Sequence, residues 1–189
     1  MRGPRTGDVL LIILSYGYVL ALIAVPFILV TLLASPYSPT PRFREMLGSL
    51  ADLTEEGHHM GLILYSISFT LLVVLFPTRP DVVAAGILPM SYGDSSAALV
   101  GRRMGRRGTL NGKTVEGSVA MFTVSLASLL LCLAFFSSFT SFTLTQRMAP
   151  SLVTALICTV VEALSPRGLD NIAVPLLGAL TFYAFSGGF

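Results

Sequence analysis

Residues 90–118 read MSYGDSSAALVGRRMGRRGTLNGKTVEGS, and they decide the fold because they interrupt a chain that is otherwise apolar. This stretch carries Asp94, four arginines, Lys113 and Glu116, whereas only 12% of the whole chain is charged. The chain has 189 residues, of which 53% are hydrophobic. An ordinary soluble domain has about 25% charged residues. Halving the charge at high apolar content indicates that lipid is the solvent for much of the chain.

Apolar segments on both sides of this stretch resemble membrane helices, which need about 20 mainly apolar residues. The first is Val9 to Ala34, with Pro26 as a kink. The others cover residues 60–76, 82–92 with a continuation to 101, 119–144, 151–164 and 172–185. Polar residues 35–58 and a tight turn at 77–80 separate them. We predict one domain, residues 1–189, built as an all-α integral membrane bundle of about six transmembrane helices. The third helix is expected to be interrupted, or to end, at Asp94.

The basic loop predicts an orientation. The positive-inside rule places residues 102–113 in the cytoplasm. With six spans, loop 35–58 and turn 165–170 then face the cytoplasm too. Because successive loops alternate between the two sides of the membrane, the acidic residues also lie on the cytoplasmic side: Glu55, Glu56, Asp94, Glu116, Glu162 and Asp170. We therefore expect one site at the cytoplasmic edge of a prokaryotic inner membrane.

Asp94 is the most unusual residue of this set. An ionisable group within a membrane segment costs about 2.5–3.5 kcal/mol even on a lenient insertion scale. Asp94 follows Gly93, where the backbone can bend, so one interpretation is the N-cap of a broken helix. The other is a carboxylate that holds a divalent cation. The residues alone leave both open.

Glycines 101, 105, 108 and 112 alternate with five cationic side chains. Successive N–H groups of a glycine-rich backbone can converge on an anion, and Arg and Lys neutralise phosphate. The alternative is a solvated basic loop that fixes topology or touches anionic lipid. A Walker A loop is excluded, because Arg107 stands where that motif requires glycine. The net charge of +2 is too small to indicate a nucleic-acid partner.

Further carboxylates open or close the later helices. A helix start favours an anion, so Asp170 could simply cap its helix. Glu162 ends a helix, where an anion is disfavoured, so it requires a partner: Lys113, an arginine or a metal ion. A clustered set of carboxylates with few histidines favours Mg²⁺ over zinc. The residues thus predict a phosphate-handling, Mg²⁺-dependent site.

Three ordered motifs, GDSSAALVGRRMG (93–105), NGKTVEGSVAMF (111–122) and VVEALSPRGLDNIAVPL (160–176), resemble the polyprenol kinase family. That family includes dolichol kinase, CTP-dependent diacylglycerol kinase, and phytol or farnesol kinases. The third motif is most similar to the phytol kinase branch. Longer members carry an Arg-Lys-x-x-His-like element near the N-terminus, and none is found here before residue 55.

The resemblance implies transfer of the γ-phosphate of CTP to a lipid alcohol, with catalytic motifs within residues 55–175. It implies Asp94, Lys113, Glu116 and Asp170 as catalytic residues. It implies nucleotide contacts from Gly101, Arg102, Arg103, Gly105, Gly112, Lys113, Thr114 and Asn171. The implied Mg²⁺ ligands are Asp94, Glu116, Glu162 and Asp170.

The implied partners are CTP, membrane lipids and a prenyl alcohol: phytol, farnesol, geranylgeraniol or polyprenol. A homo-oligomer is left open. Two other functions also remain: a phosphatidate cytidylyltransferase-like synthesis of a CDP-lipid, and a small-solute transporter, since broken helices line transport sites.

Overall fold

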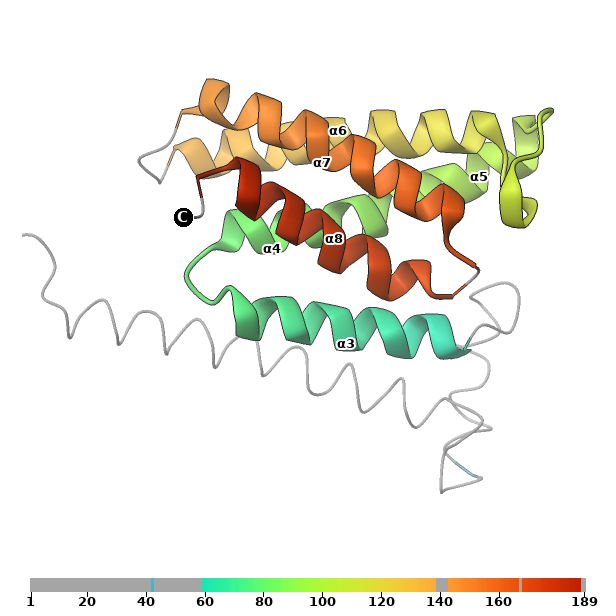
Figure 1. Ribbon diagram of the computed structural model, residues 1–189, viewed down its shortest axis with the longest axis horizontal. Helices are drawn as coiled ribbons and strands as arrows, with labels where there is room; N and C mark the ends of the chain where they lie inside the picture. Colours follow the sequence, from blue (N-terminus) through green and yellow to red (C-terminus); the bar gives the residue numbers. More distant parts are fainter. Residues whose placement is uncertain (1–41, 43–58, 139–142, 167, 188–189) are drawn as a thin grey trace, which may run out of the picture. The chain divides into compact units, whose positions relative to one another are not determined.

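The computed structural model describes residues 42, 59–138, 143–166 and 168–187 (Figure 1). Its elements are α3 (His59–Leu75), α4 (Pro80–Leu88), a π-helical turn (Pro89–Asp94), α5 (Ser95–Met104), a 3-10 turn (Leu110–Gly112), α6 (Val115–Ser137), α7 (Leu144–Leu164) and α8 (Asp170–Phe185). The described residues add one isolated β-bridge, Gly108 to Thr114. The predicted all-α fold is confirmed for these residues. The predicted first span and most of loop 35–58, with Glu55 and Glu56, lie outside them.

The chain divides into two compact units, residues 1–80 and 81–189. Helix α3 belongs to the first unit, and all three sequence motifs belong to the second. In the second unit α7 packs against both α6 and α8, and α5 packs against α6 (Figure 1). The π-helical turn contacts α6, α7 and α8, which places it centrally. Side chains buried in this unit include Val82, Met121, Leu129, Leu133, Cys158, Val174 and Phe182.

The predicted interruption at Asp94 is a change of helix type. Asp94 has helical backbone angles, φ −62° and ψ −43°, and its side chain caps nothing. The helix therefore neither breaks nor ends there, and the N-cap interpretation is wrong. Pro89 begins the π-helical turn and lacks an N–H, so the regular hydrogen-bond ladder cannot continue through it. Ser95 and Ser96 hydroxyls donate to the carbonyls of Ser91 and Gly93, at 2.7 and 2.6 Å.

Helix α7 is longer than the predicted fifth span, 151–164, because it begins at Leu144. Thr143 and Gln146 form a capping box that starts it, and Pro150 is accommodated inside. The predicted fourth span, 119–144, extends too far toward the C-terminus, since α6 ends at Ser137.

Helices α6 and α7 are long and apolar enough to cross a membrane, and only 22% and 33% of their most apolar stretches are buried. One face of α7 exposes Met148, Leu152, Leu156, Val160 and Leu164. Apolar helices that keep most side chains exposed match a lipid environment better than a soluble core. Two other described helices that the sequence predicted as spans, α8 and the apolar part of α3, are shorter than α6 and α7.

Close helix packing around the π-helical turn depends on Gly93. A Cβ added there would collide with the hydroxyl of Ser125 and lie 2.7 Å from the sulfur of Met121. Ser125 and Met121 are themselves fully buried on α6. Since both side chains are fully buried in a packed interior, α6 could not approach so closely without repacking if residue 93 had a side chain.

Gly93→Ala is therefore expected to destabilise the protein by about 1–3 kcal/mol through overpacking. Thermal unfolding of the detergent-solubilised chain measures this. The matched control is Gly108→Ala, because nothing lies within 4 Å of a Cβ at that position. Equal melting temperatures for the two variants would contradict the packing described here.

Candidate active site

A tight hairpin joins α5 to α6 and presents Lys113. The Thr109 N–H donates to the Lys113 carbonyl at 2.7 Å, and the Val115 N–H donates to the Arg107 carbonyl at 3.0 Å. Its turn uses left-handed backbone angles at Asn111 (φ 58°) and Gly112 (φ 73°). Asn and Gly are the residues that adopt this conformation most readily, so the Asn-Gly pair fixes the turn.

Two side chains at the start of α6 anchor the hairpin. One carboxylate oxygen of Glu116 accepts from the backbone N–H groups of Arg106 and Arg107, at 3.1 and 3.4 Å. Thr114 caps α6, because its hydroxyl accepts from the Gly117 N–H at 3.1 Å. The hairpin is thus held to the first turn of α6.

The tip of the hairpin reaches the end of α7. The Asn111 side-chain amide donates to the Leu164 carbonyl at 3.0 Å. This contact bridges residues 53 positions apart in the chain. Asn111 is a positioning residue that the sequence interpretation missed, although the Asn-Gly pair was the signal for it.

Lys113 lies between two buried carboxylates. Its ammonium is 2.7 Å from Glu162 Oε1 and 2.9 Å from Asp170 Oδ2. It also donates to the backbone carbonyl of Glu162 at 2.6 Å. The predicted need of Glu162 for a partner is met by Lys113. Because Glu162 and Asp170 are only 4% and 7% exposed, removing the lysine would leave two buried charges unpaired.

Asp170 accepts hydrogen bonds from three residues. Its Oδ1 accepts from the backbone N–H groups of Gly168 and Asn171, both at 3.0 Å, at the start of α8. Its Oδ2 accepts from Lys113. The predicted helix-start role and the predicted site role are therefore compatible.

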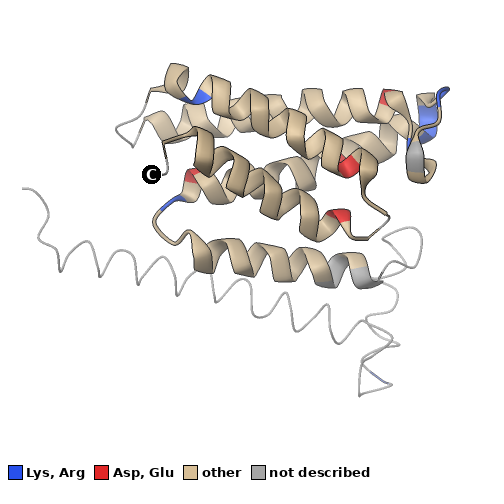
Figure 2. Cartoon of the chain, in the orientation of Figure 1, with Lys and Arg blue, Asp and Glu red and all other residues tan. Residues whose placement is uncertain are grey.

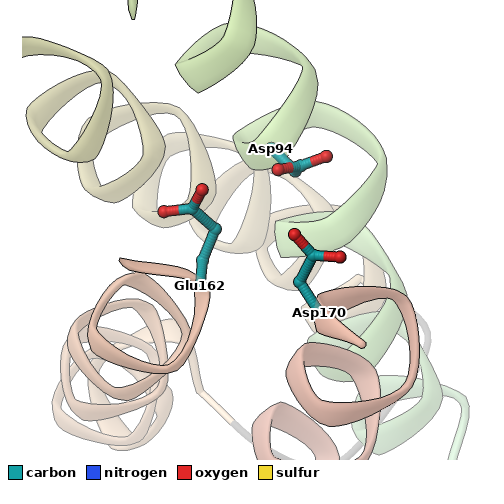
Figure 3. Close-up of side chains that lie close together, drawn as sticks. All are labelled: Asp94, Glu162 and Asp170. Atoms are coloured by element: carbon teal, nitrogen blue, oxygen red, sulfur yellow. The ribbon is translucent and has the colours of Figure 1, made fainter. Parts of the chain in front are cut away.

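Asp94 completes a cluster of carboxylates with Glu162 and Asp170 (Figure 3). One oxygen of each lies within 4.8 Å of the others, and the side chains come from the π-helical turn, α7 and α8. No described residue donates a hydrogen bond to the Asp94 carboxylate. It is thus the least compensated of the three charges.

The pKa values of Asp94 and Lys113 are both raised, but for different reasons. Burial, followed by the negative charges of Asp170 and Glu162, raises the pKa of Asp94 from 3.8 to about 6. Burial alone would lower the pKa of Lys113, but hydrogen bonds and charge from Glu162 and Asp170 outweigh it and raise that pKa. Lys113 is therefore cationic at neutral pH, and Asp94 carries a charge that the surrounding protein disfavours.

The donor atoms of this cluster fit Mg²⁺. They are carboxylate oxygens only, which Mg²⁺ prefers, and cysteine and histidine ligands suited to zinc are not part of it. One oxygen from each of Asp94, Glu162 and Asp170 lies within 4.8 Å of the others, so a small inward movement of the side chains would bring all three to one ion. Glu116 is not a member of this cluster, since its carboxylate serves the hairpin backbone.

The remaining predicted residues lie around the hairpin. Arg102 and Arg103 are exposed in the last turn of α5, and Figure 2 shows basic residues gathered between α5 and α6. A Cβ at Gly101 would lie 2.9 Å from the Thr114 hydroxyl, so the start of the hairpin packs closely there. Gly105 ends α5, and Asn171 follows Asp170 on α8.

A lysine held by buried carboxylates thus lies beside a basic, glycine-rich hairpin on an all-α bundle, and groups of this kind are suited to binding phosphate. The chain is 39% identical over 143 residues to a phytol kinase from Synechocystis sp., an alignment that covers 72% of this chain. The resemblance to the polyprenol kinase family is thereby confirmed: the chain is a homologue of a phytol kinase. The alignment spans about 60% of that relative's length. No family model and no solved structure matches the chain.

Asp94→Asn is expected to raise the melting temperature of the chain in a chelator at pH 7.5. The folded-state pKa of Asp94 is raised above 3.8, so its ionisation destabilises the folded state, an effect that grows as pH rises from about 4 to above 6. The stabilisation by Asn should therefore shrink as the pH falls below 6. Thermal unfolding at pH 5.0 and 7.5 measures it. A variant less stable than wild type at pH 7.5 would show that Asp94 is structural.

Proposed function

We propose that the chain is a CTP-dependent lipid kinase, which transfers the γ-phosphate to the hydroxyl of a prenyl alcohol. The candidate alcohols are phytol, farnesol, geranylgeraniol and polyprenol. The observation that carries this proposal is the meeting of Lys113 with Glu162, Asp170 and Asp94 from three separate motifs. The homologous phytol kinase supports the reaction class.

Phosphoryl transfer depends mainly on positioning and on neutralising charge. In our proposal Lys113 and the arginines of the α5 end bind the triphosphate, and hairpin N–H groups add further donors. Arg102 and Arg103 are exposed, so a nucleotide at the mouth of the site could contact them. Thr114 and Glu116 keep the hairpin rigid, so their effect on the nucleotide is indirect.

Asp94, Glu162 and Asp170 would hold Mg²⁺ through one oxygen each. When bound, this ion neutralises charge on the phosphate oxygens. Each carboxylate keeps a second oxygen for other contacts, and in Asp170 that oxygen already accepts from the start of α8.

We assign the proton of the acceptor alcohol to Asp94. It is the one carboxylate of the cluster that no described N–H group holds, so it keeps an oxygen available to the alcohol hydroxyl.

The acceptor would come from the bilayer. In our proposal the chain is an integral membrane protein, and the exposed apolar faces of α6 and α7 lie in lipid. By the positive-inside rule, the arginines at the hairpin support a cytoplasmic location for this end. A prenyl chain could then stay in lipid while its hydroxyl reaches Asp94.

The test is incubation of the purified chain with a prenol, Mg²⁺ and CTP labelled at the γ-phosphate. A labelled lipid monophosphate is expected. Asp94→Asn should lower its rate of formation roughly 100-fold or more, because it removes the proton acceptor. Arg106→Gln is the matched control, since it removes an exposed charge from the same hairpin outside the proposed site.

The position of the label separates this proposal from its rivals. A cytidylyltransferase would transfer the α-phosphate of CTP and release the γ label in pyrophosphate. Uptake of a solute into vesicles without CTP would favour a transporter. Failure to label any prenol or diacylglycerol with the γ-phosphate would refute the kinase assignment.

A further inference from the structure

Lys113 has no free hydrogen-bond donor in this structure. A lysine ammonium carries three N–H groups. Three acceptors lie within hydrogen-bond distance of the Lys113 nitrogen: the Glu162 carbonyl, Glu162 Oε1 and Asp170 Oδ2, at 2.6, 2.7 and 2.9 Å. The proposed contact between Lys113 and a phosphate therefore cannot form unless at least one of these partners is released.

Two of those partners belong to the proposed ion site. Glu162 and Asp170 lie, with Asp94, in the cluster whose oxygens are within 4.8 Å of one another. A divalent ion bound there would compete with the ammonium for carboxylate oxygens. The two cations would also repel one another strongly at such short range in a buried site.

We infer that Lys113 is an internal cation that compensates the carboxylate cluster until a divalent ion replaces it, and that this replacement releases the lysine to bind nucleotide phosphate. The inference rests on the proposed function, because it concerns the same site. It adds a coupling: the divalent ion prepares the lysine for the triphosphate, and the triphosphate in turn favours the ion. Such coupling is reciprocal by thermodynamic necessity.

The contacts of the hairpin hold its backbone but leave the Lys113 side chain flexible. Its backbone is fixed by Asn111 on α7 and by Glu116 on α6, whereas the ammonium lies at the end of a flexible four-carbon stem. The Lys113 side chain is 14% exposed, so it lies at the mouth of the cluster. Its release therefore requires rotation of this side chain, whereas the backbone contacts of the hairpin can stay in place.

The chain offers a direct test, because Lys113 is its single lysine. The wild-type protein in detergent is treated briefly with acetic anhydride, and acetylation of Lys113 is quantified by mass spectrometry. Mg²⁺ alone should raise the rate of acetylation roughly 5-fold or more, the lower end of typical couplings between sites. Mg²⁺ with CTP should protect the lysine again, and CTP with a chelator should have no effect. The N-terminal amine of the same sample controls for the reagent.

A second measurement uses Mn²⁺ binding followed by electron paramagnetic resonance, without nucleotide. Lys113→Met should bind Mn²⁺ roughly 5-fold tighter or more than wild type, since the competing cation is gone. Arg106→Gln, which loses one charge from the same hairpin, should bind like wild type. Equal or weaker binding by Lys113→Met would overturn the inference, as would a rate of acetylation that Mg²⁺ leaves unchanged or lowers.

These measurements need neither lipid nor turnover, so they separate two kinds of failure. An active kinase whose Lys113 does not respond to Mg²⁺ would refute the exchange alone. A responsive lysine in a chain that phosphorylates no lipid would refute the kinase assignment.

Discussion

The second unit of this protein depends on the ion pairs between one lysine and two buried carboxylates. Lys113 comes from the hairpin before α6, Glu162 from the end of α7, and Asp170 from the start of α8. Breaking a buried pair by removing one partner typically costs about 3–5 kcal/mol. The two ion pairs of Lys113 thus link three segments at one end of the unit. The same contacts bring one ammonium and two carboxylates together in a small volume.

The rest of the unit brings Asp94 to this pair. Pro89 opens a π-helical turn that ends at Asp94, and Gly93 lets that turn lie against α6. π-helical turns occur frequently at functional sites, where they re-aim a side chain without ending the helix. Asp94 then adds a third negative charge that the protein alone does not balance. A half-buried carboxylate that is only partly compensated reduces stability, and a functional requirement is the simplest reason for retaining it.

Much of this site could be predicted from the sequence. The partner requirement of Glu162 followed from its place at a helix end, and the structure supplies Lys113. The apolar segments predicted an all-α chain, although α7 begins seven residues earlier than expected because of its capping box. The type of helix at Asp94 could not be predicted, because Gly-Asp-Ser-Ser suits a cap as well as a π-helical turn. The contact between Glu116 and the hairpin backbone could not be predicted either, because residue spacing alone does not define the geometry of the hairpin.

The most direct test of this account is a structure of the chain with Mn²⁺ and a non-hydrolysable CTP analogue, with the ion located by anomalous scattering. The account predicts one ion between Asp94, Glu162 and Asp170, with the Lys113 ammonium moved onto a phosphate oxygen. An ion bound elsewhere, or Asp94 found at the opposite end of the helices from Lys113 and Asp170, would contradict it.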